Sequence, residues 1–483
     1  MNIILLVVDT LRYDRIGYHG SYAPIRTPNL DRLARKSLVY DNAFSSSFPT
    51  IPHRTDLITG RYGNPFYPWA PLRFDQPTLP RYLAEHGYCT QLIHDTPHLV
   101  NGGHAFDYPF HAWTFVRGAE VDRPLIDDQP LTMLDNWHHD PSLPLPEAAA
   151  EQLNHRMLIT YTRANRGRRE PEDWNAARLF TAATEFLRAN RRRDNFFLWL
   201  DCFDPHEPWD APPDLVRQYD KSSGADGRID PRLFTEAARR DGDSSLPEVI
   251  VQKQTALYDA KVSWVDHWFG VLLDTLEETG LDDKTAIVLT ADHGTNVYDW
   301  GKFGKTGPQS EMEAHVPLLV HVPGVSAERR TPLVQPQDIT ATLIDIANAP
   351  PPAWCDGTSV LAADSAGRDL ALCGSAIDGW PKTADWPAFT AFAKDRYLMV
   401  SPDPAADRLY AFGSHDNCIE QHRDYAARLR NEALDEIAKR GAPGEVVAWY
   451  RNNGRTPRPE QMGMPLRPHG WRQYFTQTWG TWE

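Results

Sequence analysis

One short stretch of the chain, from Ser46 to Arg61, holds the residues best suited to chemistry. Thr50 supplies a hydroxyl, Pro52 follows it by two residues, and Arg54 lies two residues further on. In a helix Arg54 would lie one turn beyond Thr50 on the same face, where its guanidinium could bind two oxygens of a tetrahedral oxyanion. A threonine hydroxyl is a weak nucleophile, so it needs a metal or a base from elsewhere in the chain. The alternative is an ordinary loop that enters a helix, with Arg54 in solvent.

Acidic and histidine residues follow three apolar runs. Continuous runs of this kind are typical of strands buried in a parallel sheet, and they cover residues 3–8, 196–200 and 285–291. The polar residues that follow them are Asp9, Asp204 with His206, and Asp292 with His293. The carboxyl ends of such strands are where α/β folds place their sites. Helix caps explain one such ending but not three, because a cap needs a single acceptor and no histidine.

These side chains are suited to binding a divalent metal. Hard cations prefer carboxylate oxygens, and zinc or manganese also accept imidazole. We therefore expect one site for Mn, Zn, Ca or Mg with four ligands, Asp9, Thr50, Asp292 and His293, in which the metal would hold Thr50 as an alkoxide. No full second set of ligands is visible in the sequence, so one ion per chain is favoured.

Composition limits the partners of the protein. The net charge of −15 over 483 residues argues against a nucleic-acid surface. The five cysteines are scattered without metal-ligand spacing, which favours free thiols in a reducing compartment. The first apolar run is too short for a signal peptide, and no stretch approaches a membrane span. We expect a cytoplasmic protein that binds neither nucleic acid nor membrane.

The chain divides into three segments that differ in composition and in hydrophobic pattern. Residues 1–368 alternate strand and helix patterns, as expected for an α/β catalytic domain, while residues 369–441 suggest a small antiparallel sheet with one helix at 422–440. The tail, 442–483, is rich in proline and aromatic residues and lacks periodicity. So many aromatic side chains would form a sticky patch in water. We expect the tail to pack on its parent domain or to join two copies of the chain as a homo-oligomer.

Further segments of the chain match motifs of one known family, in the order in which that family carries them. They are Asn2–Leu11, Thr27–Ala34, Pro52–Tyr62, Gly87–Thr90, Pro205–Pro208, Ala291–Gly294, Val316–Leu318, Asp338–Ala347 and Asp356–Ser359. Together they resemble the sulfatase family within the alkaline phosphatase superfamily, over nearly the whole length. The resemblance implies an α/β sandwich like that of alkaline phosphatase, with a large, mostly parallel central sheet flanked by helices and a small C-terminal antiparallel-sheet subdomain.

The resemblance also implies roles for individual residues. It implies metal ligation by Asp9, Asp292 and His293. Arg54 would support the nucleophile, and His206 would contact the oxygens or the leaving group of the substrate. A lysine would bind the transferred group; Lys305 is favoured by the family's spacing, and Lys302 is its rival.

Three departures from the family pattern matter. Sulfatases carry Cys or Ser, oxidised to formylglycine, where this chain has Thr50; threonine cannot become that aldehyde, so no formylglycine is expected. Thr10 stands where many sulfatases have a second aspartate, which the phosphonate monoester hydrolase branch of the family also lacks. The segment from Asp95 to His98 stands where the family has a Lys-Trp-His triplet. Asp95 and His98 could bind a cationic or hydroxylated end of the substrate, or they could hold the loop together.

The expected function follows from Thr50. Threonine in this place resembles the nucleophile of related nucleotide pyrophosphatase/phosphodiesterases, which form a phosphothreonine. We expect a metal-dependent hydrolase of small anionic phosphate esters, either phosphodiesters or phosphonate monoesters, that works by double displacement through Thr50. The alternatives are a sulfuric ester hydrolase without formylglycine, a phospho-group transferase and a non-catalytic relative.

Overall fold

The computed structural model describes residues 1–20, 25–124, 156–221, 248–305, 309–362, 367–375 and 389–454. The chain divides into two compact units, each built from separate segments. The first comprises residues 1–41, 80–306 and 316–330, and the second comprises residues 42–79, 307–315 and 331–483. The predicted domain boundaries at 368 and 441 stay predictions.

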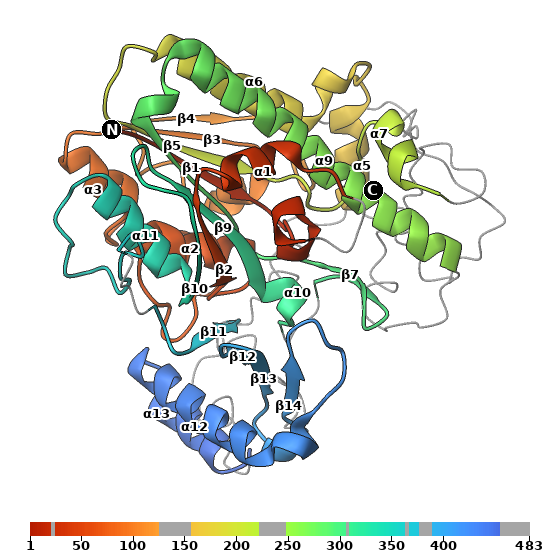
Figure 1. The fold of residues 1–483 in the computed structure, drawn as a ribbon, viewed down its shortest axis with the longest axis vertical. Helices are drawn as coiled ribbons and strands as arrows, with labels where there is room; N and C mark the ends of the chain where they lie inside the picture. Colours follow the sequence, from red (N-terminus) through yellow and green to blue (C-terminus); the bar gives the residue numbers. More distant parts are fainter. Residues whose placement is uncertain are drawn as a thin grey trace. The chain divides into compact units, whose positions relative to one another are not determined.

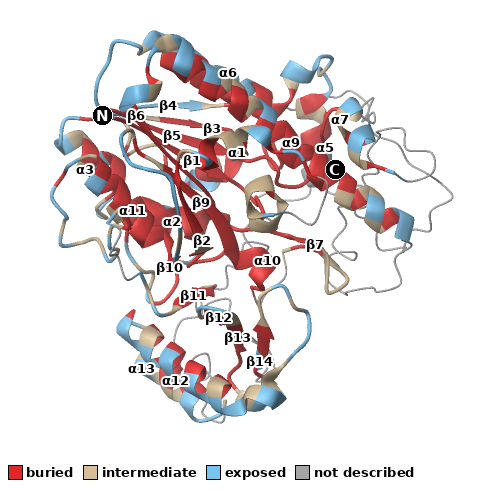
Figure 2. Cartoon of the chain, viewed as in Figure 1, coloured by how far each residue is buried: buried red, intermediate tan, exposed pale blue. Residues whose placement is uncertain are grey.

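The first unit contains the two strands that lead to the predicted metal ligands: β1 ends just before Asp9, and β6 ends just before Asp292. Its strands are β1 (Asn2–Val8), β3 (Cys89–His94), β4 (Ala112–Phe115), β5 (Phe196–Cys202), β6 (Thr285–Ala291), β7 (Asn296–Asp299) and β8 (Lys302–Gly304). β1 pairs in parallel with β5 and β6, and β3 pairs in parallel with β4 and β5. Every residue of β1 and β5 is buried (Figure 2), which explains their unbroken apolar sequences.

Four elements contain a boundary between the units. They are β2 (Leu38–Phe44), α3 (Leu79–Glu85), β9 (His315–His321) and β10 (Glu328–Val334). The large sheet has the strand order β10-β2-β9-β6-β1-β5-β3-β4, and β9 runs antiparallel to β6. The predicted α/β architecture with a large, mostly parallel sheet is therefore confirmed.

Several helices of the first unit pack on its long helix, α9 (Glu248–Thr279), or on its strands. Its helices also include α1 (Pro28–Ala34), α5 (Arg156–Asn165), α6 (Asn175–Ala189) and α7 (Pro213–Tyr219). α6 packs on α9 and contacts β3 and β5 (Figure 1). Asp266 of α9 accepts the backbone N–H groups of Asn29 (3.1 Å) and Leu30 (2.7 Å), which fixes the first turn of α1. None of the helices in the described part of the chain combines the length and apolar composition that a membrane span requires.

The second unit contains the predicted antiparallel sheet. Its strands are β11 (Ala371–Gly374), β12 (Phe389–Phe392), β13 (Arg396–Val400) and β14 (Arg408–Ala411), and its helices are α2 (Thr50–Thr59), α10 (Glu311–Ala314), α11 (Pro336–Ile346), α12 (Arg423–Lys439) and α13 (Gly444–Arg451). The four strands pair in sequence order, all antiparallel. The expected small sheet with one following helix is confirmed.

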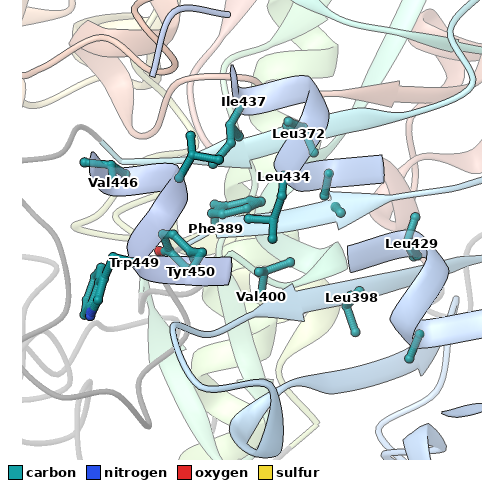
Figure 3. Close-up of a cluster of buried hydrophobic side chains, with 14 of the residues drawn as sticks. Leu372, Phe389, Leu398, Val400, Leu429, Leu434, Ile437, Val446, Trp449 and Tyr450 are labelled. Atoms are coloured by element: carbon teal, nitrogen blue, oxygen red, sulfur yellow. The ribbon is translucent and has the colours of Figure 1, made fainter. Parts of the chain in front are cut away.

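The start of the C-terminal tail differs from expectation. The sequence from 442 onward predicted no periodic element, yet residues 444–451 form helix α13. Trp449 and Tyr450 of α13 are buried in an apolar cluster with Phe389 and Leu434 (Figure 3). For these two aromatic residues the packing alternative therefore holds, because both are covered within their own unit. Residues 455–483, with the remaining aromatic residues of the tail, lie outside the described residues, and the homo-oligomer stays a prediction.

Candidate active site

Parallel pairing of β1 with β6 brings the predicted metal ligands together. Val8 lies opposite Ala291 in the register of the two strands, so Asp9 and Asp292 leave neighbouring strands at the same edge of the sheet. The ligand atoms of Asp9, Asp292 and His293 lie within 4.8 Å of one another. All three side chains are fully buried. Two carboxylates confined to one buried site favour a bound cation, because like charges in a low dielectric repel strongly.

Local hydrogen bonds orient these ligands. Asp292 Oδ1 accepts the backbone N–H groups of Thr10 (3.0 Å) and His293 (2.7 Å), which leaves Oδ2 for a metal. His293 Nδ1 lies 2.8 Å from the carbonyl oxygen of Gly294, a contact that needs the proton on Nδ1 and leaves a lone pair on Nε2. Burial lowers the pKa of His293 to about 4, so the imidazole is neutral near pH 7. The donor set fits a divalent metal bound by oxygen and nitrogen.

Thr10 has a strained backbone conformation beside the predicted metal ligands. Its φ of 58° lies in the left-handed region, which is rare for a β-branched residue and costs about 1–3 kcal/mol. The conformation is held by the bond from Thr10 N–H to Asp292 and by the Tyr258 hydroxyl, which donates to the Thr10 carbonyl at 2.8 Å. Strain of this kind is concentrated at functional sites.

We predict one tightly bound divalent ion per chain. Within the described residues, Asp9, Asp292 and His293 are the one group of three acidic, cysteine or histidine residues whose ligand atoms converge. Metal analysis of the purified protein, followed by chelation and re-addition of single metals, should give full activity at one equivalent. Two ions per chain, both needed for turnover, would contradict this prediction.

Glu207 brings two further predicted residues together in the first unit. Lys305 Nζ lies 2.6 Å from Glu207 Oε2, and the same carboxylate oxygen lies 3.2 Å from His206 Nδ1. Glu120 Oε2 lies 3.1 Å from that nitrogen, and the ring of Phe203 stacks on the imidazole with centroids 4.2 Å apart. His206 and Lys305 therefore share one acidic neighbour, Glu207.

The two candidate lysines occupy different positions. Lys305 follows β8 and joins the Glu207 cluster, whereas Lys302 begins β8 opposite Asp299. The contacts found among the described residues include none between the Lys302 side chain and His206 or Glu207. This arrangement favours Lys305 as the lysine that binds the transferred group, which stays a prediction.

Asp95 and His98 both lie against the segment after β5. Asp95 Oδ1 accepts the backbone N–H of Phe203 at 2.7 Å, and the His98 ring meets the Phe203 ring edge-on at 5.8 Å. Burial, together with the nearby Asp204 carboxylate, raises the pKa of Asp95 well above its usual range. These contacts favour the loop-holding role; binding of a substrate end by either residue stays a prediction.

The second unit contains the nucleophile candidate. Helix α2 begins at Thr50, and Arg54 Nη1 donates to the Thr50 carbonyl oxygen at 3.2 Å. The Arg54 side chain is 0% exposed and Thr50 is 3% exposed. The alternative of a solvated Arg54 is therefore wrong.

Polar contacts fix the chain just before Thr50. Asp56 Oδ2 accepts the backbone N–H of Ser47 at 2.6 Å, and Asp56 Oδ1 accepts from Gln337 Nε2 at 3.0 Å. Burial raises the pKa of Asp56 to about 8. Ser45 Oγ lies 2.9 Å from His53 Nδ1. Loop and helix thus restrain each other through side chains that the sequence analysis did not single out.

The structure thus groups the predicted residues in two sets. The first unit holds Asp9, Asp95, His98, His206, Asp292, His293, Lys302 and Lys305, and the second unit holds Thr50 and Arg54. Glu207 and Lys261 were missed. The sequence did contain an indication for Lys261, because it is a single lysine within a mostly uncharged stretch of the helix. The structure shows that the residues around it in α9 are buried.

Comparisons with known proteins agree on one family. The family model described as Sulfatase matches residues 1–349. Iduronate 2-sulfatase of Homo sapiens is 24% identical over 393 residues, which are 71% of this chain and 65% of that protein. The multifunctional alkaline phosphatase superfamily protein PehA of Trinickia caryophylli is 24% identical over 416 residues, 74% of this chain and 76% of that protein. Phosphonate monoester hydrolase SpPMH from Silicibacter pomeroyi superposes with a TM-score of 0.67 at 20% identity, covering 91% of this chain and 95% of that one.

Proposed function

Because this chain belongs to the sulfatase family, a family of ester hydrolases, we propose that it is a metal-dependent hydrolase of small anionic phosphate esters. Phosphonate monoesters and phosphodiesters are the favoured substrate classes. The observation that carries this proposal is Thr50, because the methyl group on its β-carbon prevents formation of formylglycine. The fold shared with a phosphonate monoester hydrolase is consistent with it.

Asp9, Asp292 and His293 would hold the metal, and Thr50 would be its fourth ligand. When bound, a divalent cation supplies Lewis acidity and lowers the pKa of a hydroxyl that it contacts. The buried, neutral imidazole and the two buried carboxyl side chains supply the nitrogen and oxygen donors that such a cation binds.

The reaction would proceed by double displacement. The Thr50 oxygen forms a bond to phosphorus while the ester bond breaks, and the alcohol leaves with a proton. His206 would donate that proton; its imidazole is held through Nδ1, which lies 3.1 Å from Glu120 Oε2 and 3.2 Å from Glu207 Oε2. Water then cleaves the phosphothreonine and restores the hydroxyl. Arg54 and Lys305 would stabilise the charge on the non-bridging oxygens.

Substrate preference tests the proposal. We expect unmodified wild-type protein to cleave an aryl phenylphosphonate or a diaryl phosphate at least about 100-fold more efficiently, in kcat/KM, than the matched aryl sulfate. The reason is chemical: a formylglycine hydrate expels sulfate by returning to the aldehyde, and a threonine ester has no such exit. Steady-state kinetics on 4-nitrophenyl esters of each class would measure the ratio. Efficient cleavage of the sulfate with almost none of the diester would favour the sulfatase alternative, toward which the names of several relatives point.

A further inference from the structure

Lys261 is a buried cation on the long helix α9. Its residue is 3% exposed, and its neighbours along the helix, Ala260 and Val262, are fully buried. An ammonium group loses several kcal/mol of hydration free energy on burial unless its donors are satisfied. The position of such a group therefore calls for a structural explanation.

All three donors of Lys261 go to one short segment, residues 204–208. The Nζ atom donates to the carbonyl oxygens of His206 (2.7 Å) and Pro208 (2.9 Å), and it lies 2.7 Å from Asp204 Oδ1. An ammonium has three N–H groups, so these contacts use its full capacity. One rigid helix thus fixes three successive points of this segment.

The segment held by Lys261 presents His206 and Glu207. The Lys261 ammonium binds the carbonyl of the same residue whose imidazole meets Glu120 and Glu207. Glu207 in turn lies 2.6 Å from Lys305 Nζ. A shift of the segment would therefore move both His206 and the partner of Lys305.

We propose that Lys261 is a positioning residue for the reaction, which holds His206 where it can protonate the leaving group and holds Glu207 against Lys305. This inference rests on the proposed function. Lys261 does not touch the substrate; it acts through the backbone of residues 204–208. Small displacements of an acid cost much of its contribution, so loss of the anchor affects poor leaving groups most.

Three variants test the proposal. Lys261→Met removes the ammonium and keeps the length of the side chain. Because that change leaves the Asp204 carboxylate buried without its cation, the double variant Lys261→Met with Asp204→Asn guards against simple unfolding. Lys253→Met is the matched control, since Lys253 lies on the same helix and is half-buried.

Two measurements are needed. Amide hydrogen exchange of residues 203–210 should become at least about tenfold faster in both Lys261 variants and stay unchanged in the control. The second measurement uses a series of aryl esters whose phenol leaving groups differ in acidity. Relative to wild type, kcat of the Lys261 variants should fall about 100-fold or more for the least acidic phenol and much less for 4-nitrophenol. KM should stay nearly constant.

The outcomes separate the two proposals. Unchanged exchange overturns the anchoring role, and faster exchange with an unchanged leaving-group dependence shows a structural role alone and overturns the positioning role. If the wild type cleaves none of the esters, the proposed function falls, while hydrogen exchange still decides whether Lys261 holds the segment.

Discussion

Replacing Thr50 by alanine should reduce kcat by at least about three orders of magnitude and leave the fold intact. The change removes the proposed nucleophile and one proposed metal ligand together. Thr50 begins helix α2, where alanine is tolerated, and its side chain is small. Circular dichroism and thermal unfolding would establish that the variant is folded before its kinetics are compared.

Two further substitutions distinguish the chemistry at this position. Thr50→Ser should keep much of the activity, because the attacking oxygen survives. Thr50→Cys, produced together with a formylglycine-generating enzyme, tests whether the pocket accepts sulfate when the aldehyde is present. Intact mass of the wild type should equal the mass of the sequence, without oxidation at Thr50.

Thr55→Ala is the matched control on the same helix. Thr55 is buried, and its hydroxyl donates to the Ile51 carbonyl at 2.8 Å within α2. Its loss should cost about 1 kcal/mol or less of stability and little activity. If Thr50→Ala keeps wild-type turnover, the double-displacement proposal is wrong.

The convergence of Asp9, Asp292 and His293 could be predicted because it depends on local pattern and on sheet geometry. Asp9 and Asp292 each follow an apolar strand directly, and two parallel neighbours in register must end side by side. The same logic placed Arg54 one turn from Thr50, as the contact between them confirms. Periodicity and strand ends are properties of consecutive residues, so one sequence is enough to see them.

Contacts between distant segments could not be predicted in this way. Glu207 and Lys305 are 98 residues apart, and Lys261 lies 55 residues beyond His206. Nothing in the local pattern says which buried carbonyl a lysine will meet. Helix α13 was missed for another reason: Pro443 and Gly444 mark a break in the chain, yet burial of Trp449 and Tyr450 against α12 stabilises a short helix there.

The second large effect concerns Asp292. Asp292→Asn should lower kcat/KM by about 1,000-fold or more, because an amide is a much weaker metal ligand than a carboxylate. In the wild type, Asp292 Oδ1 accepts the backbone N–H groups of Thr10 at 3.0 Å and His293 at 2.7 Å. The amide oxygen of the asparagine can still accept both bonds. The local fold, including the strained Thr10, should therefore survive.

The metal-free protein should respond in the opposite direction. Without a cation, Asp9 and Asp292 place two buried carboxylates together, and removal of one charge relieves that repulsion. Metal-free Asp292→Asn should have a larger free energy of unfolding than metal-free wild type, by on the order of 1–2 kcal/mol, and should therefore unfold at a higher temperature. The wild type should gain about 4 kcal/mol at a metal concentration 1,000-fold above Kd, and the variant should lose most of that gain.

Asp266→Asn is the control for Asp292→Asn, because it changes a buried aspartate that has a structural role and is not a proposed metal ligand. Asp266 Oδ2 accepts from Asn29 Nδ2 at 3.1 Å, and an amide nitrogen in its place cannot accept that bond. Asp266→Asn should therefore destabilise the metal-free and metal-bound protein alike, by about 1 kcal/mol. The stabilisation that metal confers should persist, because Asp266 is not among the converging ligands. Opposite signs for the two substitutions in metal-free protein are the expected result. If Asp292→Asn instead destabilises the metal-free protein as Asp266→Asn does, and retains the full metal-dependent gain, then Asp292 is a structural residue and the metal site is wrongly assigned.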